Sequence, residues 1–170
     1  DIPALLRHWP ALAGVLLGLS ALTAQAQYPD KPITFVVPFA AGSATDQLAR
    51  ALGTEVTRIT RQSVVVDNKP GASGFIGAET VKRAAPDGYT VFITTNTTHA
   101  ANEHLFKKLP YDPVKDFLPV TGLGKGGQIM IVNLDVPAKS VAEFIALAKS
   151  KPGKVSFGSG SSSSRVAGEM

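Results

Sequence analysis

Four polar turns carry most of the residues that could bind a ligand, and each turn follows a segment that is predicted to form a β-strand. The turns cover residues 40–43, 68–74, 95–98 and 158–164, and they are rich in small and hydroxyl-bearing residues. Backbone N–H groups and hydroxyl groups are neutral hydrogen-bond donors, and the N–H groups at a helix start also attract an anion. None of the turns contains an evident catalytic group. The pattern therefore predicts a site that binds an oxyanion, with no catalytic residue.

Patterns that would indicate an enzyme are incomplete in this sequence. The glycine-rich stretch 122–127 opens no predicted helix, so it does not match a phosphate-binding loop, and we expect no cofactor. Gly158–Gly160 lacks the G-x-S-x-G spacing of a hydrolase nucleophile. His99 and Glu103 are spaced for one helix face beside His104, but ligand spacing alone is weak evidence for a metal site, and we expect none. A secreted hydrolase or a metal-dependent enzyme stays the alternative to a binding protein.

Two charged residues beside the polar turns have two interpretations each. Asp46 lies three residues after Ser43, a spacing that favours a capping box at a helix start. In the second interpretation its carboxylate faces the ligand and accepts a hydrogen bond from an ammonium or hydroxyl group. Arg165 is either a solvated surface residue or a clamp for a ligand carboxylate. The sequence leaves both alternatives open.

Composition narrows the classes of partner. The chain has 170 residues, of which 44% are hydrophobic and 18% are charged, values that are ordinary for a globular protein. The net charge of +4 comes from lysines and arginines that are scattered along the chain, so we expect no nucleic-acid partner. There is no cysteine, which excludes disulfides and thiolate sites. The charge supports only a modest preference for anionic small molecules.

Residues 1–26 have the order of a secretory signal peptide. Arg7 precedes an apolar run over 11–22, and Ala24 and Ala26 are the small residues that a signal peptidase recognises. The run is shorter than the roughly 20 residues of a membrane-spanning helix. We therefore predict cleavage after Ala26 and export. The chain starts without methionine and ends inside a newly begun helix, so we expect it to be a fragment.

Strand and helix patterns alternate through the next part of the chain. β-Branched and aromatic runs indicate the strands, and apolar residues at helical spacing indicate the helices between them. This order predicts an α/β fold with a parallel sheet, whose polar turns meet at one edge where ligands bind. Arg50 falls off the apolar stripe of the first helix, and we expect it to be solvated. The expected strands are 33–37, 64–66 and 89–94, and the expected helices run from Ser43 to about Thr60, through Ile76 and Val81, and to about Phe106.

The glycines of the stretch 122–127 predict a hinge between two units, because glycine tolerates large backbone changes. We expect residues 27–125 to form the first α/β domain and residues 126–170 to begin a second one that is cut off.

The second unit is expected to repeat the same alternation. Strands are predicted over 129–132 and 155–157, and a last helix is predicted to follow the serine-rich turn. Between the strands, Ser140 and Glu143 form a second predicted capping box. The helix that it opens should turn four apolar residues inward, namely Val141, Phe144, Ile145 and Ala148.

Five motifs occur in order along the predicted mature segment. They are Tyr28-Pro-Asp-Lys-Pro-Ile33, Pro38-Phe-Ala-Ala-Gly42 through Asp46, Asn68-Lys-Pro-Gly-Ala72, Pro86-Asp-Gly-Tyr-Thr90 and Leu109-Pro-Tyr-Asp-Pro-Val-Lys-Asp-Phe117. Together they are far more specific than any one motif. The sequence resembles the extracytoplasmic solute receptors of tripartite tricarboxylate transporters, the Bug (Bordetella uptake gene) family.

The resemblance implies a periplasmic binding protein of the type II-like, Venus-flytrap fold, with two doubly wound α/β domains of which the second is truncated here. It implies a monomer that captures a small organic carboxylate and delivers it to membrane permease subunits. A receptor that presents its ligand to a membrane sensor kinase would bind in the same way.

The resemblance also implies which residues bind the ligand. Family receptors hold a carboxylate with backbone N–H groups of the first strand–helix turn and of a turn in the second domain. This chain departs from the family pattern at Ser43, Ser73, Phe75 and Arg165, and we leave the turn around Ser73 out of the site. The implied ligand-binding residues are Phe39, Ala40, Ala41, Gly42, Ser43, Asp46, Thr95, Asn96, Thr97, Thr98, Gly158, Ser159, Gly160, Ser161 and Ser162.

Overall fold

The computed structural model describes residues 28–170. The predicted signal peptide and its cleavage site after Ala26 lie outside the described residues.

Three parallel strands form the sheet of the first unit. They are β1 (Ile33–Val37), β2 (Val64–Asn68) and β3 (Thr90–Phe92). The strand order is β2-β1-β3, with Phe35 of the central strand paired with Val66 of β2 and Val91 of β3. The predicted parallel sheet is confirmed, although β2 extends two residues further than expected and β3 is shorter. All three carboxyl ends therefore lie at one edge of the sheet.

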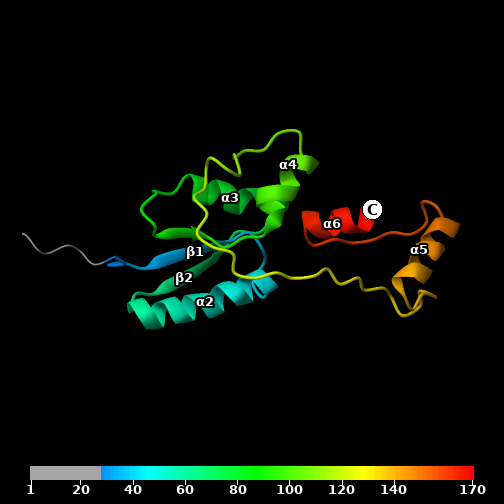
Figure 1. The fold of residues 1–170 in the computed structure, drawn as a ribbon, viewed down its shortest axis with the longest axis horizontal. Helices are drawn as coiled ribbons and strands as arrows, with labels where there is room; N and C mark the ends of the chain where they lie inside the picture. Colours follow the sequence, from blue (N-terminus) through cyan, green and yellow to red (C-terminus); the bar gives the residue numbers. More distant parts are fainter. Residues whose placement is uncertain (1–27) are drawn as a thin grey trace, which may run out of the picture.

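Helices cover both faces of this sheet (Figure 1). Helix α2 (Ala44–Thr60) packs on one face, where Phe35 and Val37 join Ala49 in the buried core. Helix α3 (Phe75–Lys82) packs on the other face, which takes Val36 because successive side chains of a strand alternate. Burying an aromatic or aliphatic side chain of this kind contributes about 1.5–3 kcal/mol, so the alternating core holds the unit together.

The first helix begins and ends at residues that suit helix termini. The Ser43 hydroxyl accepts a hydrogen bond from the Asp46 N–H at 3.2 Å. At the other end Arg61 adopts the left-handed conformation, with φ 60°, and its N–H donates to the Thr57 carbonyl at 2.8 Å. Such a residue ends a helix by satisfying one of its last carbonyls. The predicted helix from the Ser43 turn to Thr60 is confirmed.

Short helical turns follow β2 and β3 at the carboxyl edge. After β2 the chain forms η3 (Ala72–Gly74), which leads directly into α3. After β3 it forms one wide helical turn, η4 (Thr97–Ala101), which continues as α4 (Asn102–Leu105). The predicted short helix that reaches about Phe106 is confirmed.

The remaining chain contains two helices, α5 (Val141–Ser150) and α6 (Ser162–Glu169). The predicted strands 129–132 and 155–157 are wrong, because neither segment lies beside another strand among the described residues. Ile129 and Ile131 are 86% and 87% exposed. A strand needs a hydrogen-bonded neighbour, and these segments have none in residues 28–170.

Helix α5 forms where it was predicted, but its apolar side is not covered. The Ser140 hydroxyl accepts from the Glu143 N–H at 3.2 Å, whereas the Glu143 carboxylate accepts from Lys139 and not from Ser140. No residue of α5 is buried, and Val141 is 61% exposed. The expectation that Val141, Phe144, Ile145 and Ala148 point into a core is therefore wrong for the described residues. Figure 1 shows the chain running away from the first unit to α5 and returning with α6.

Within residues 28–170, no helix is both long enough and apolar enough to cross a membrane.

Candidate functional site

The first predicted turn connects β1 to α2 and is largely exposed. The Ser43 N–H donates to the Ala40 carbonyl at 3.1 Å, which closes the turn, and Ala41 and Gly42 lie at the surface. Gly42 has a φ of +83°, a conformation that side chains disfavour. The first N–H groups of α2 have no intrahelical acceptor, so this turn presents positive dipoles at the sheet edge.

Asp46 lies beneath this turn and is only 2% exposed. Its Oδ2 accepts from the Gly42 N–H at 2.8 Å and from the Arg50 Nε at 3.0 Å. Its Oδ1 accepts from the Asn68 Nδ2 and from the Arg50 Nη2, both at 3.0 Å. The hydrogen bonds from Arg50 and the Gly42 N–H hold the pKa of Asp46 at about 2, below its usual 3.8.

These contacts favour one of the two interpretations of Asp46. Both carboxylate oxygens already accept two hydrogen bonds from protein donors, which supports a bracing role at the helix start over a contact with ligand. In a complete capping box the Asp46 carboxylate would accept a hydrogen bond from the Ser43 N–H. In the structure it accepts from the Gly42 N–H instead. Asp46 therefore holds the backbone of the turn in place from below.

Sequence reasoning missed two members of this cluster, Arg50 and Asn68. Arg50 is exposed, as expected, with 53% of its side chain accessible to solvent, but its guanidinium also pairs with both carboxylate oxygens of Asp46. Asn68, the last residue of β2, also donates to the Phe39 carbonyl at 3.1 Å. The i,i+4 spacing of Asp46 and Arg50 was a usable signal. The partnership with Asn68 had no local signal, since the two residues are far apart in the chain.

The predicted turn 95–98 follows β3, which neighbours β1 in the sheet. Asn96 is exposed, whereas Thr97 and Thr98 are buried, with exposed fractions of 2% and 0%. The Thr98 hydroxyl bonds to the Thr94 hydroxyl at 2.7 Å and to the His99 Nδ1 at 2.8 Å. Thr98 therefore supports the turn from inside.

His99 is the central residue of the alternative metal site, and its ring is hydrogen-bonded and packed within the protein. Its ring packs edge-on against Phe117 at 4.9 Å between centroids, and burial lowers its pKa. Glu103 and His104 are exposed on α4. No group of three or more metal-binding side chains occurs in residues 28–170. The geometry gives no support to a metal-dependent reaction at His99.

The predicted turn that begins at Gly158 leads into α6. Gly158, Ser159 and Gly160 are exposed. Ser161 caps α6, and its partner Ser164 completes a reciprocal capping box. Arg165 in the first turns of α6 pairs with Glu169 at 2.8 Å, so its guanidinium is directed along its own helix.

Helix α6 starts against the turn that follows β3. The Ser163 hydroxyl donates to the Asn96 Oδ1 at 3.1 Å and lies 3.3 Å from the Thr97 hydroxyl. Ser162 is buried and donates to the Asn102 Oδ1 at 2.9 Å. Hydrogen bonds therefore join the turn 95–98 directly to the serine-rich turn at the start of α6, and the turn after β1 lies at the same sheet edge as the turn 95–98.

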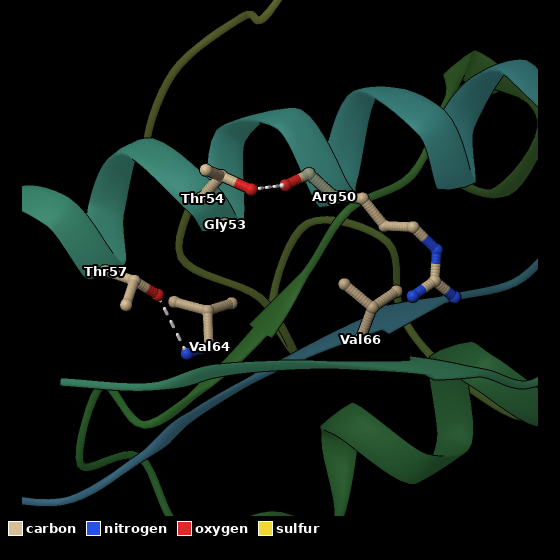
Figure 2. Close-up of a pocket in the computed structure, with 6 residues that line it drawn as sticks. All are labelled: Arg50, Gly53, Thr54, Thr57, Val64 and Val66. Atoms are coloured by element: carbon tan, nitrogen blue, oxygen red, sulfur yellow. Dashed lines mark hydrogen bonds between the residues drawn. The ribbon is translucent and has the colours of Figure 1, made fainter.

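A groove of about 360 Å³ lies elsewhere, between α2 and β2 (Figure 2). Arg50 and Thr57 border it on the helix, and Val64 and Val66 border it on the strand. None of the predicted ligand-binding residues lines this groove. Its hydroxyls are already engaged, as when Thr57 accepts from the Val64 N–H at 3.2 Å. We therefore do not place the site there.

Comparison with known proteins identifies the family. The sequence profile described as "Tripartite tricarboxylate transporter family receptor" matches residues 48–170. The chain belongs to this receptor family. The resemblance that the five motifs indicated is thereby confirmed. Protein BugT of Bordetella pertussis is 34% identical over 148 residues, which are 86% of this chain and 44% of that protein.

Two solved structures of similar proteins carry organic acids. The structure described as R. palustris Rpa4515 with adipate is 36% identical, with a TM-score of 0.74 over 79% of this chain and 46% of that one. MatC (Rpa3494) from Rhodopseudomonas palustris with bound malate is 34% identical, with a TM-score of 0.61 over 72% of this chain and 42% of that one. These likenesses confirm the expected periplasmic-binding-protein fold, and this chain spans 46% and 42% of the two proteins.

The receptor-family chain spans about half the length of the curated relatives it matches. The boundary near residue 125 between the two predicted domains stays a prediction.

Proposed function

We propose that this protein is the solute-binding receptor of a tripartite tricarboxylate-type transport system. It binds a small organic carboxylate in the periplasm and passes it to membrane permease subunits, acting as a monomer after cleavage of its signal peptide behind Ala26. The observation that carries the proposal is the family match, together with the dicarboxylates held by two similar proteins of the same fold.

The chemistry of the sheet edge supports this function. The turn 39–43 offers backbone N–H groups, and the turn 158–162 offers exposed backbone groups and the exposed Ser159 hydroxyl. Both are neutral donors, so they can hold a carboxylate without the desolvation cost of a buried cation. Arg50 and Arg165 are already paired with Asp46 and Glu169.

The receptor needs no catalytic group for this task. The serines of α6 cap their own helix or bond to residues of the first unit, and His99 is bonded to Thr98. A hydrolase would require a base within hydrogen-bond reach of its nucleophile, and no serine–histidine hydrogen bond is present in the described part of the chain. We therefore place capture and release, with no bond cleavage, at this site.

A thermal-shift experiment on the full-length natural chain tests the function. Adipate and malate at millimolar concentration are expected to raise the Tm, because a ligand that binds the native state stabilises it by about 2.7 kcal/mol at 100 times its Kd. Dimethyl adipate is the matched control, since it keeps the chain length but lacks the carboxylates, and it should leave the Tm unchanged.

The experiment extends to tricarboxylates, amino acids and aromatic acids, with divalent metals as a separate arm. A metal-dependent shift with no shift from any carboxylate would contradict the proposal and favour the enzyme alternative.

A further inference from the structure

Asn102 is the centre of a buried hydrogen-bond network that the proposed site residues do not include. Its side chain is 0% exposed. The Asn102 Nδ2 donates to the Ser73 carbonyl at 2.9 Å and to the Tyr111 hydroxyl at 3.1 Å. Its Oδ1 accepts from the Ser162 hydroxyl at 2.9 Å. One amide group therefore joins η3, the segment after α4, and the start of α6.

Every group in the network has a partner inside the protein. The Tyr111 hydroxyl, which is itself buried, donates onward to the Thr98 carbonyl at 2.7 Å. Among the described residues no buried side-chain nitrogen or oxygen lacks a hydrogen bond. Removing one partner from such a network leaves another group buried and unsatisfied, which is more costly than losing an exposed hydrogen bond.

The contact with Ser162 differs from the others because it crosses a long exposed segment. Within residues 112–170, Ser162 is the one buried residue, with an exposed fraction of 5%. The intervening chain passes through α5, none of whose residues is buried. Residues 112–170 are therefore anchored on the first unit at α6. Their one buried residue there is Ser162, whose hydroxyl donates to the Asn102 side chain.

Asn102 also holds a strained turn in the first unit. Ala72 and Ser73 have φ values of 46° and 54°, a left-handed conformation that is unfavourable for residues with a side chain. The Ser73 carbonyl is the acceptor for Asn102. A conformation of this kind persists where the surrounding contacts determine it. The same amide thus sets the shape of the turn 71–74 and the position of α6.

We infer that Asn102 and Ser162 form a latch that seats α6 on the first unit and so positions the turn 158–162 for ligand binding. Asn102 is a positioning residue, since its side chain is buried among protein groups. The Ser162 hydroxyl donates to Asn102, so it contributes to ligand binding by holding the turn 158–162 in position. The ligand arm of this inference rests on the proposed receptor function, whereas the latch itself is a property of the chain without ligand.

Ser162→Ala tests the latch in the full-length natural chain. Hydrogen exchange of the α6 amides, followed without ligand, is expected to become about 3- to 10-fold faster, which corresponds to one hydrogen bond of ordinary net strength. Exchange in α2 should stay unchanged. The Kd for adipate, measured by calorimetry, should rise by a similar factor. Ser150→Ala is the matched control, because it removes an exposed serine hydroxyl that bonds only within α5, outside the proposed ligand-binding residues.

Asn102→Ala supplies a double-mutant cycle. Adding Ser162→Ala to this variant should leave α6 exchange unchanged, because the acceptor is already gone. If Asn102→Ala does not fold, the comparison of α6 exchange between Ser162→Ala and the wild type is sufficient to test the latch.

Three results are decisive, and they separate the latch from the function. Unchanged α6 exchange in Ser162→Ala overturns the latch. Weaker adipate binding with unchanged exchange overturns it too, and makes Ser162 a direct ligand contact. If the wild-type protein binds no adipate, that ligand is wrong for the proposed function, while α6 exchange still decides the latch.

Discussion

Replacing Gly74 with alanine is expected to lower the free energy of unfolding by about 2–4 kcal/mol, because the substitution adds backbone strain to a steric clash. Gly74 has a φ of +87°, and an added Cβ would lie 2.6 Å from the Thr98 Cγ2. Thr98 cannot move aside easily, since it is β-branched, fully buried and bonded through its hydroxyl to Thr94 and His99. Urea unfolding followed by circular dichroism measures the change.

Gly153→Ala is the matched control for Gly74→Ala. Gly153 has a φ of +70°, but nothing lies within 4 Å of the position that its Cβ would occupy. This variant carries the backbone strain without the clash, so we expect it to lose only about 1–2 kcal/mol. Equal losses in the two variants would contradict the close packing of Gly74 on Thr98. The Gly74 variant should also bind adipate more weakly, because the turn 95–98 is displaced.

Asp46→Asn is expected to destabilise the protein, and the loss should be pH-dependent. The hydrogen bonds from Arg50 and the Gly42 N–H hold the pKa of Asp46 at about 2 in the folded chain, against 3.8 ordinarily. The ionised carboxylate therefore contributes its full stabilisation above about pH 4, and this contribution is lost as the pH falls towards 2. Asparagine cannot replace it, since its amide nitrogen would face donors.

Urea midpoints of the wild type and the Asp46 variant between pH 7 and pH 2 provide the measurement. The two curves should lie apart at neutral pH and converge towards pH 2. Glu55→Gln is the matched control on the same helix: its partner Arg58 lies 2.8 Å away, and both side chains are exposed, so little change is expected. Lost ligand affinity at unchanged stability would instead make Asp46 a ligand contact, and our interpretation of its bonds would be wrong.

The elements that form from local signals were predictable from the sequence. Ser43 and its spacing to Asp46 marked the start of α2, and the run 33–37 marked the central strand. These signals act within a few residues, because a cap or an amphipathic stripe depends on neighbours in the chain. The four polar turns were likewise predicted to follow strands. Three of them follow β1, β2 and β3, whereas 158–164 follows the segment 155–157, which is not a strand in the structure.

The predicted strands 129–132 and 155–157 show where local pattern is insufficient. Their β-branched and aromatic residues suit a strand, but a strand is stabilised by hydrogen bonds to another strand, and none lies beside them in residues 28–170. The residue types of a segment indicate how readily it forms a strand. Whether another strand lies beside it depends on the tertiary structure.

Local patterns in the sequence were sufficient to predict the parallel α/β unit and the turns at its edge, and five ordered motifs were sufficient to indicate the receptor family. The tertiary structure decided the roles of individual polar residues. Asp46 meets Asn68 across 22 positions and Asn102 meets Ser162 across 60, distances at which residue spacing carries no signal. A buried polar group must find its partner wherever the fold brings one, so these contacts emerge only once the chain has packed.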